Sequence, residues 1–295
     1  MRPWLLLGLL LGFLWAVAWG RPTAVTGPAF TEGPARVSGG TTTTTTLPVG
    51  SQNWCPSMLA CWMLDEASGT RTNAQGTTSR NLTESGGTTA NDTTNKMEGT
   101  AAALLVANIW LQTTDATLKA IPAPFTCGLW ARKTASNSMI VFGAYNGTVN
   151  GWQVWHNSDT NWQFQMFGGG NNIYFTPGNA ANTWTHVAVR YGGGASGTTL
   201  QSYKDGLPRT TAEGPYIVST GTVFQVGSGS YAGQIDELWC AGSVLSDAAI
   251  CRICSCGVRG EQCTCTGSSF ATTGRNASAC SSCTLPALCN APTPP

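Results

Sequence analysis

Charge is scarce in this chain. Only 10% of its 295 residues are Asp, Glu, Lys or Arg, and the formal net charge is +1. Nucleic acids and anionic membrane surfaces both require a basic face on their protein partner, so the composition argues against either as a ligand. Gly, Thr, Ser and Asn are frequent instead of charged residues. This composition is typical of turn-rich β structure that faces an extracellular solvent.

Histidine is also scarce, with two residues, His156 and His186. Neither lies beside a recognisable Ser or Cys nucleophile motif. We expect His186 to be structural and His156 to be an exposed turn residue at the end of a strand. The glycine runs at 168–170 and 192–194 precede no helix, so they are loop glycines and not a phosphate-binding loop. The sequence therefore contains no pattern for nucleophilic hydrolysis or phosphate binding.

Apolar runs long enough to span a bilayer are absent after residue 20. Before it, Arg2 precedes a nearly continuous apolar run from Trp4 to Val17, and Ala18 and Gly20 are the small residues that a signal peptidase reads. We expect cleavage after Gly20. An uncleaved anchor is the alternative, but the run is shorter than the roughly 20 residues of a spanning helix. The predicted location is secreted or on the cell surface, with no membrane span after cleavage.

Cysteine, by contrast, is abundant: the chain has twelve. In an exported chain they predict disulfides rather than free thiols. The competing interpretation is a zinc site built from Cys251, Cys254, Cys280 and Cys283, but the gap between these pairs is longer than in a usual zinc ribbon. Eight cysteines lie from Cys251 onward, and their pairing cannot be deduced from the sequence.

The chain divides into four parts. Residues 1–20 are the predicted signal peptide, and residues 21–53 form a linker rich in Thr, Pro and Gly that has no apolar periodicity. Residues 54–253 show short apolar strands separated by turns, including single strands expected at 101–111, 152–156 and 162–167. Residues 254–295 form a tail rich in cysteine. We therefore predict an all-β fold, a two-sheet antiparallel sandwich with a small disulfide-rich C-terminal appendage.

Four motifs in this order carry a family resemblance. They are Trp62-Met63-Leu64-Asp65-Glu66-Ala67-Ser68-Gly69; Phe125-Thr126-Cys127-Gly128-Leu129-Trp130; Trp184-Thr185-His186-Val187 with Tyr203-Lys204-Asp205-Gly206; and Gly233, Ile235-Asp236-Glu237 and Leu245-Ser246 with Ile250. Together they resemble laminin-G-like jelly-roll domains of the concanavalin A-like lectin and glucanase group. The resemblance implies two antiparallel sheets packed face to face, with the first and last strands side by side. Asp205-Gly206 suits a type I′ hairpin turn, and Ser246 is expected to cap a short helical turn at 247–250.

The resemblance also implies a disulfide. If residues 61–66 pair antiparallel with residues 235–240, Cys61 and Cys240 come close enough to bridge. Cys127 and Cys55 would then remain for each other or for the tail.

Enzymes of this architecture are the first comparison for the acidic strand. Laminarinase-like glycoside hydrolases carry Glu-x-Asp-x-x-Glu, and a retaining mechanism needs two carboxylates about 5 Å apart. Gln234 and Trp239 stand where the two glutamates would be, so we expect no enzyme of this type. A structural calcium is a better use of the acids, because hard oxygen ligands suit Ca²⁺. The candidate ligands are Asp65, Glu66 and Asp236; alternatively, Asp236 binds backbone amides and Glu66 is solvated.

Aromatic residues remain for ligand recognition. On a strand, Trp152 and Val154 share one face while Trp155 takes the other, so one set is core and the other is available to stack on a sugar ring. The candidate ligand-binding residues are Trp155, Asn157, Asp159, Gln163, Tyr145 and Tyr174. The leading function is non-catalytic recognition of carbohydrate or glycosylated surfaces through a lectin-like sandwich. The alternative is a structural or adhesive module that binds another extracellular protein, and a divergent polysaccharide hydrolase comes third.

Overall fold

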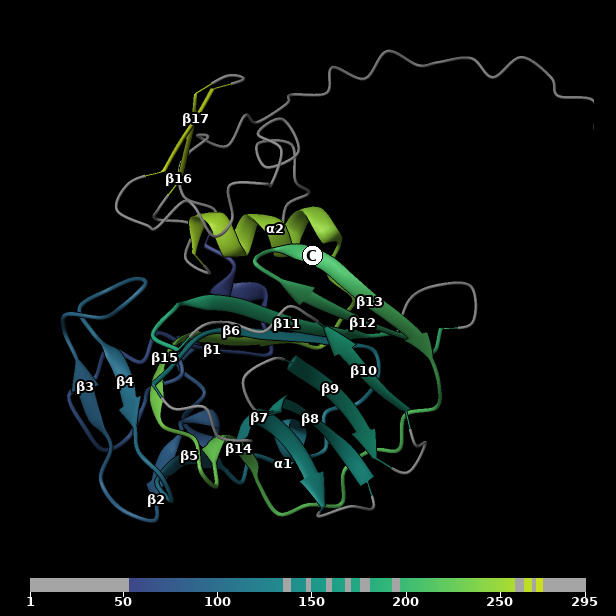
Figure 1. Ribbon diagram of the computed structural model, residues 1–295, viewed down its shortest axis with the longest axis horizontal. Coiled ribbons are helices and arrows are strands. Elements are labelled where there is room, and N and C mark those ends of the chain that lie inside the picture. The colour runs from purple at the N-terminus through teal and green to yellow at the C-terminus, as the bar shows by residue number, and fades with distance from the viewer. Residues whose placement is uncertain are drawn as a thin grey trace, which may run out of the picture. The chain divides into compact units, whose positions relative to one another are not determined.

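The computed structural model describes residues 53–134, 139–146, 150–157, 161–167, 171–175, 181–192, 197–257, 263–266 and 269–272. The predicted signal peptide, nearly all of the predicted linker, Asp159 and most of the cysteine-rich tail lie outside these residues. Two large antiparallel sheets of the described chain pack face to face (Figure 1), and residues 263–266 and 269–272 pair as a third sheet of two strands. The predicted all-β jelly-roll sandwich is thereby confirmed.

One sheet has eight strands in the order β13-β12-β11-β6-β15-β4-β3, with β1 paired to β15 off this path. Its strands are β1 (Ala60–Trp62), β3 (Ala90–Asp92), β4 (Ala102–Leu105), β6 (Phe125–Lys133), β11 (Thr185–Tyr191), β12 (Thr199–Lys204), β13 (Leu207–Glu213) and β15 (Gly233–Ala241). Because β1 and β15 pair, the first and last strands of the sandwich lie side by side, as the family resemblance implied.

The other sheet has seven strands in the order β10-β9-β8-β7-β14-β5-β2. Its strands are β2 (Thr83–Ser85), β5 (Trp110–Thr113), β7 (Met139–Asn146), β8 (Asn150–Asn157), β9 (Asn161–Phe167), β10 (Asn171–Phe175) and β14 (Phe224–Ser228). The remaining elements are η1 (Cys55–Ser57), η2 (Thr78–Arg80), α1 (Ala116–Lys119), α2 (Asp247–Cys256), β16 (Cys263–Thr266) and β17 (Ser269–Thr272).

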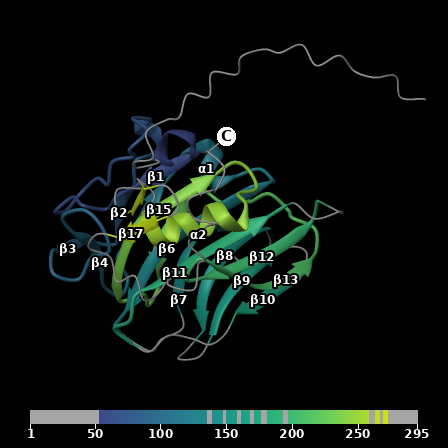
Figure 2. The same cartoon turned by 90° about the horizontal axis from the view of Figure 1, so that it is seen from above.

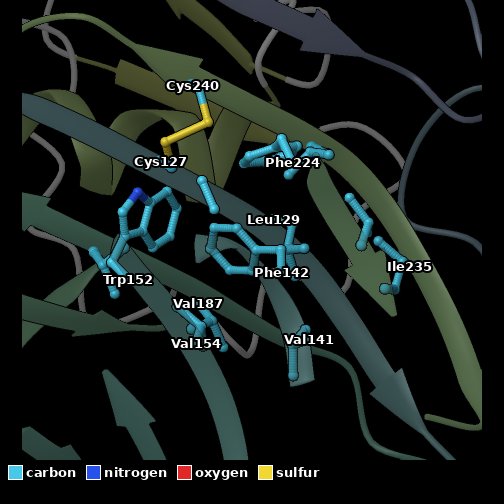
Figure 3. Close-up of a cluster of buried hydrophobic side chains, with 14 of the residues drawn as sticks. Cys127, Leu129, Val141, Phe142, Trp152, Val154, Val187, Phe224, Ile235 and Cys240 are labelled. Atoms are coloured by element: carbon cyan, nitrogen blue, oxygen red, sulfur yellow. A yellow bond between two sulfur atoms is a disulfide. The ribbon is translucent and has the colours of Figure 1, made fainter. Parts of the chain in front are cut away.

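The main core fills the space between the two sheets (Figure 3). Residues at alternate strand positions face it, because successive side chains of a strand point to opposite sides. In the seven-stranded sheet Phe142, Trp152 and Phe224 are fully buried there, with Trp152 edge-to-face against Phe142 at 5.6 Å between ring centroids. Leu129 and Val187 face them from the eight-stranded sheet.

Two predicted hairpins are present. β8 and β9 pair antiparallel, with Trp155 opposite Gln163. β12 and β13 are joined by Asp205-Gly206, whose φ angles of 53° and 76° are both positive, as a type I′ turn requires. The single strand expected at 101–111 is wrong: β4 and β5 belong to different sheets. Asn108, with φ of 66°, lies in the turn that carries the chain from one sheet to the other.

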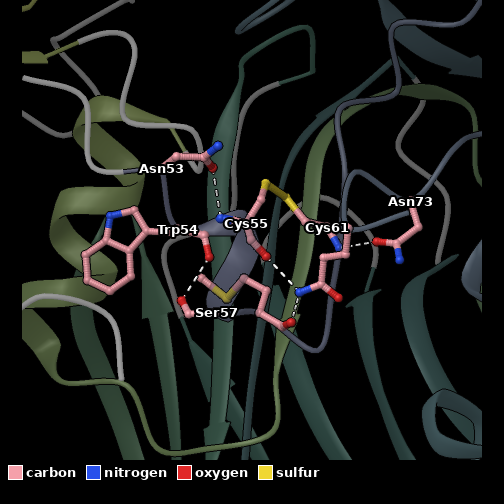
Figure 4. Close-up of a disulfide and its surroundings, with 8 residues drawn as sticks. Asn53, Trp54, Cys55, Ser57, Cys61 and Asn73 are labelled. Atoms are coloured by element: carbon pink, nitrogen blue, oxygen red, sulfur yellow. Dashed lines mark hydrogen bonds between the residues drawn. A yellow bond between two sulfur atoms is a disulfide. The ribbon is translucent and has the colours of Figure 1, made fainter. Parts of the chain in front are cut away.

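The disulfide expected between Cys61 and Cys240 is also wrong. The bridges are Cys55–Cys61 and Cys127–Cys240 (Figures 3 and 4). β1 does pair antiparallel with β15, but Cys61 stands opposite Trp239 and Ala60 stands opposite Cys240. The side chains of Cys61 and Cys240 therefore face opposite sides of the sheet. Cys240 faces the main core, where Cys127 of β6 is its direct register partner.

A second apolar layer covers the outer face of the eight-stranded sheet. Helix α2 lies across this sheet (Figures 1 and 2) and packs Ile250 and Ile253 against Trp239 and Tyr203. The predicted cap at Ser246 is present, since its Oγ accepts a hydrogen bond from the Ala249 N–H at 3.1 Å. The helix is longer than the expected turn and runs to Cys256, past residue 254, where the tail was predicted to begin.

The cysteines of α2 bear on the zinc alternative. Cys251, Cys254 and Cys256 are all disulfide-bonded. A cysteine in a disulfide has no thiolate to offer a metal, so the first cysteine pair of the proposed zinc ribbon is already used.

Candidate functional site

The outer face of the seven-stranded sheet is the candidate site. Trp152 and Val154 point into the core with 0% exposure, so Gln153 and Trp155, which alternate with them on β8, point outward. Trp155 is half-buried on this face. It stands between Ile140 of β7 and Gln163 of β9 in the sheet register. Trp152 is therefore a core residue and Trp155 lies on the outer face, as the strand alternation predicted.

A row of glutamines crosses this face, next to Trp155. Gln112 of β5 pairs with Gln225 of β14, Gln225 pairs with Gly143 of β7, Gly143 pairs with Gln153 of β8, and Gln153 pairs with Gln165 of β9. We call these four glutamines, Gln112, Gln225, Gln153 and Gln165, the amide row. Each alternates along its strand with residues of the main core, which places all four side chains on the outer face. Gln112, Gln225 and Gln165 are half-buried there, whereas Gln153 is 2% exposed and serves to orient Gln165.

Hydrogen bonds orient both ends of the amide row. The Gln153 Nε2 donates to Gln165 Oε1 at 2.7 Å. At the other end, the Trp110 Nε1 donates to Gln112 Oε1 at 3.0 Å. In both bonds the carbonyl oxygen of the terminal glutamine is the acceptor. The Nε2 groups of Gln112 and Gln165 have no acceptor among the described residues, so they are available to donate to a ligand.

A second aromatic group lies at one end of these strands. Tyr145 of β7 and Phe167 of β9 both pair with Gly151 of the intervening strand β8. Their rings stack over it with centroids 5.8 Å apart and an interplanar angle of 29°. A Cβ at position 151 would lie 2.1 Å from the Ala144 carbonyl oxygen, and the φ of Gly151 is +96°. Glycine at this position lets the two rings meet across the strand.

The predicted ligand-binding residues share one sheet as far as they are described. Trp155, Gln163 and Tyr145 lie on the outer face, with Gln163 8% exposed. The backbones of Asn157 and Tyr174 belong to β8 and β10, and Tyr174 is the register partner of Gln163. Asp159 lies outside the described residues. The sequence interpretation missed the amide row, although each of its glutamines stands between apolar residues at strand spacing, a signal that identifies the outward positions.

His156 corrects another expectation. It was predicted to be an exposed turn residue, yet it is 1% exposed and its ring packs edge-to-face on Trp162 at 4.8 Å. The reason is the strand period: His156 shares the inward face of β8 with Trp152 and Val154. His186 is also fully buried, between the rings of Trp130 and Trp239.

Two of the three carboxylates predicted to bind calcium accept hydrogen bonds from the backbone of a loop. Asp65 Oδ1 accepts hydrogen bonds from the Thr100 N–H at 2.5 Å and the Ala101 N–H at 2.9 Å. Asp236 Oδ2 accepts from the N–H groups of Met97 at 2.7 Å and Glu98 at 3.1 Å. Both carboxylates therefore bind backbone amides of one segment, residues 97–101, as the alternative interpretation anticipated for Asp236.

The third predicted calcium ligand, Glu66, lines a recess together with Asp65. Glu66 Oε1 accepts the Thr72 N–H at 2.6 Å, and the recess of about 280 Å³ beside it is lined by Met63, Asp65, Glu66, Thr72 and Ala74. Within the described ranges, no group of three or more His, Cys, Asp or Glu side chains is placed to hold a metal ion. Calcium binding by Asp65, Glu66 and Asp236 stays a prediction.

The acidic strand β15 is irregular where its two carboxylates stand. The register with β6 shifts between Asp236 and Trp239, and Glu237 has a φ of +47°. Asp236 and Glu237 are 0% and 1% exposed, so the bulge buries both carboxylates instead of exposing one. Gln234 and Trp239, at the positions of the two catalytic glutamates in laminarinase-like enzymes, are 4% and 0% exposed.

About half of the chain matches a known protein family. Residues 107–251 match the family model described as concanavalin A-like lectin/glucanases superfamily, of the laminin G type. The laminin-G-like jelly roll predicted from the sequence is confirmed for this part of the chain. No curated protein matches the sequence.

Solved structures share the fold at low sequence identity. Domain 4 of AbnA, an extracellular arabinanase from Geobacillus stearothermophilus, was solved in complex with arabinotriose. It is 15% identical over 66% of this chain and 96% of its own, with a TM-score of 0.50. The receptor-binding domain of botulinum neurotoxin type G is 10% identical over 66% of this chain, with a TM-score of 0.48, and this chain spans 50% of its length. At these identities the likeness concerns the fold.

Two observations concern the environment of the protein. Cys55–Cys61 and Cys127–Cys240 are disulfides, which persist in oxidising, extracellular compartments. In the part of the chain that the structure describes, no helix combines the length and the apolar character needed to cross a membrane.

Proposed function

We propose that this protein is a non-catalytic carbohydrate-recognition protein that binds glycans on the outer face of its seven-stranded sheet. The observation that carries the proposal is the position of Trp155 beside the amide row on one sheet face. An indole ring stacks on the apolar face of a sugar, while carboxamides donate to and accept from its hydroxyls. Aromatic and amide groups together supply both kinds of contact that a sugar offers.

The fold comparison supports this proposal. Domain 4 of AbnA, which shares the sandwich, was solved with arabinotriose bound. The absence of the Glu-x-Asp-x-x-Glu pattern, with Gln234 and Trp239 in the glutamate positions, supports recognition without hydrolysis. The predicted secretion or surface location fits a role at glycosylated surfaces.

Replacement of Trp155 by alanine tests the proposal. On a glycan array, the full chain is expected to bind a defined set of glycans. Trp155→Ala is expected to lose about 1–2 kcal/mol of binding free energy, or roughly 5- to 30-fold in affinity. Trp184→Ala is the matched control, because Trp184 is another half-buried tryptophan but packs against the cluster of Met97, Trp130 and the α2 cysteines. Equal binding by wild type and Trp155→Ala, or no glycan bound at all, would contradict the proposal.

A further inference from the structure

The seven-stranded sheet differs from its partner in charge. The six strands β5, β7, β8, β9, β10 and β14 contain no Asp, Glu, Lys or Arg. The eight-stranded sheet, in contrast, carries Arg132, Lys133, Arg190 and Lys204 among others. In a chain with 29 such residues, the candidate face has been built from neutral side chains alone.

The remaining strand of this sheet, β2, contains one acidic residue, Glu84, whose carboxylate has partners within the protein. Glu84 Oε1 accepts hydrogen bonds from the Gly69 N–H at 2.7 Å and from the Thr89 N–H at 2.9 Å. The same oxygen lies 3.8 Å from the Arg71 guanidinium. Glu84 therefore stabilises the turn beside β2 and does not add a charge for a ligand to meet.

We infer that the candidate face binds an uncharged glycan that lies across the strands along the amide row. This inference rests on the function proposed above and specifies its ligand class. A carboxylate or sulfate on the sugar would lose hydration on binding and find no cation on these strands to replace it. Neutral hydroxyls, by contrast, are satisfied by carboxamides, each of which both donates and accepts.

The direction of the chain follows from the sheet register. The amide row runs perpendicular to the strands, from Gln112 on β5 to Gln165 on β9, across four inter-strand steps. At about 4.8 Å a step these cover about 19 Å, enough for several consecutive sugar units. Gly143 has no side chain at the middle of the row, so nothing rises from that position to interrupt a chain lying there.

The two hydrogen-bonded ends of the row support the same direction. Because Gln112 is held by Trp110 and Gln165 by Gln153, their amide groups are oriented before a ligand arrives. Pre-oriented donors lose less side-chain entropy on binding. A glycan that reaches both ends gains from both, whereas a short one reaches only part of the row.

Charge is tested first, with matched ligands. A glycan array that holds each backbone with and without sialic acid or sulfate is read together with polygalacturonic acid and its fully methyl-esterified form. The glycans that count are those that bind the wild type and bind Trp155→Ala more weakly. They are expected to be uncharged and to bind about tenfold or more tighter than their charged counterparts. In Gln225→Lys, which places a cation within the row, the charged counterparts are expected to gain.

Chain direction is tested with oligosaccharides of increasing length from the best neutral ligand, measured by calorimetry. Wild-type affinity is expected to rise with length until the row is spanned. Gln112→Leu and Gln165→Leu are each expected to weaken the longest oligomer about 5- to 10-fold. The same substitutions are expected to change binding of the shortest oligomer less, and Thr211→Val, exposed on β13 of the other sheet, serves as control.

The outcomes separate the two proposals. Binding of charged glycans as tight as that of neutral ones, still lost in Trp155→Ala, would overturn this inference and leave the proposed function standing. Affinity that does not depend on oligomer length would also overturn it, with recognition of a single sugar in its place. If no glycan binds the wild type, the proposed function itself fails.

Discussion

A single buried arginine shows how this chain handles the few charges it has. Arg71 is 0% exposed, and its guanidinium donates to the Glu66 carbonyl at 2.5 Å and to Thr89 Oγ1 at 2.6 Å. Burial lowers the pKa of Arg71, while the nearby carboxylates of Glu66 and Glu84 act to raise it. The result is a compact network of hydrogen-bonded charge beside β2, apart from the amide row.

This network is expected to make the free energy of unfolding depend on pH. Burial acts to raise the pKa of Glu84, but the hydrogen bonds from Thr89 and Gly69 and the Arg71 guanidinium outweigh it and leave the pKa below its ordinary value of 4.5. A lowered folded-state pKa contributes stability that is complete above the ordinary value and is lost as the pH falls below it. The free energy of unfolding, from urea titrations between pH 6 and 3, is therefore expected to fall on the acid side.

Glu84→Gln isolates that contribution. The variant is expected to be less stable than wild type at pH 6 and to show a shallower loss of stability toward pH 3. Glu213→Gln, which removes an exposed carboxylate on β13, is the control. Identical pH slopes in Glu84→Gln and wild type would show that this carboxylate does not account for the acid sensitivity.

Individual side chains were predictable where a strand keeps its period. The alternation in Trp152, Val154 and Trp155 was enough to separate core from surface on β8. The same rule places His156, the last residue of the strand expected at 152–156, in the core; the expectation of an exposed turn residue did not apply the rule to the strand's end. Strand alternation does not predict that Asp236 and Glu237 are both buried. A bulge interrupts β15 between them and Trp239, and a bulge depends on the neighbouring strand rather than on local sequence.

Among the elements, the disulfides Cys55–Cys61 and Cys127–Cys240 differ in the length of chain that they close. Cys127–Cys240 connects β6 with β15 across a sequence separation of 113, whereas Cys55–Cys61 closes a separation of 6. In the chain-entropy account a longer loop loses more freedom when it is cross-linked in the unfolded state. Replacing Cys127 and Cys240 by alanine is expected to cost about 2 kcal/mol more than replacing Cys55 and Cys61.

Equilibrium unfolding of the two double variants in urea measures this difference. Thermal unfolding under matched conditions gives an independent ranking. Equal losses for the two pairs would mean that loop length does not govern the stabilisation here, and that local packing of each bridge sets it instead.

Elements were predicted well where turn chemistry is local. Asp205-Gly206 specified the β12–β13 hairpin, and Ser246 specified the start of α2. The change of sheet between β4 and β5 was missed because the apolar run from Ala101 to Leu111 reads as continuous. The disulfide partners were missed for a related reason: strand pairing was inferred correctly, but the face that each cysteine occupies follows from a register that only the assembled sheet provides.

On the scale of the whole molecule, one face of β8 belongs to the core and the other carries the proposed glycan site. Trp152 contacts Phe125, Phe142, Phe164 and Phe224 between the sheets. Trp152→Ala is therefore expected to lower the free energy of unfolding by about 3–5 kcal/mol and the melting temperature by roughly 10 °C. Trp155→Ala is expected to weaken glycan binding roughly 5- to 30-fold with a much smaller change in melting temperature.

Differential scanning fluorimetry and glycan binding, measured on the same preparations, check this division. A melting temperature that falls as far in Trp155→Ala as in Trp152→Ala would assign Trp155 to structure rather than to the ligand.

The pairing of β1 with β15 has a consequence for how the protein is presented to its surroundings. Both strands belong to the eight-stranded sheet, and α2 leaves from the same side of the sandwich. Trp54, near the start of the described chain, and the end of α2 therefore both lie on the layer opposite the amide row. A tether or neighbouring domain attached at either point would lie on the side of the eight-stranded sheet, away from the glutamines and Trp155. Attachment at either point would therefore leave the proposed glycan-binding face uncovered.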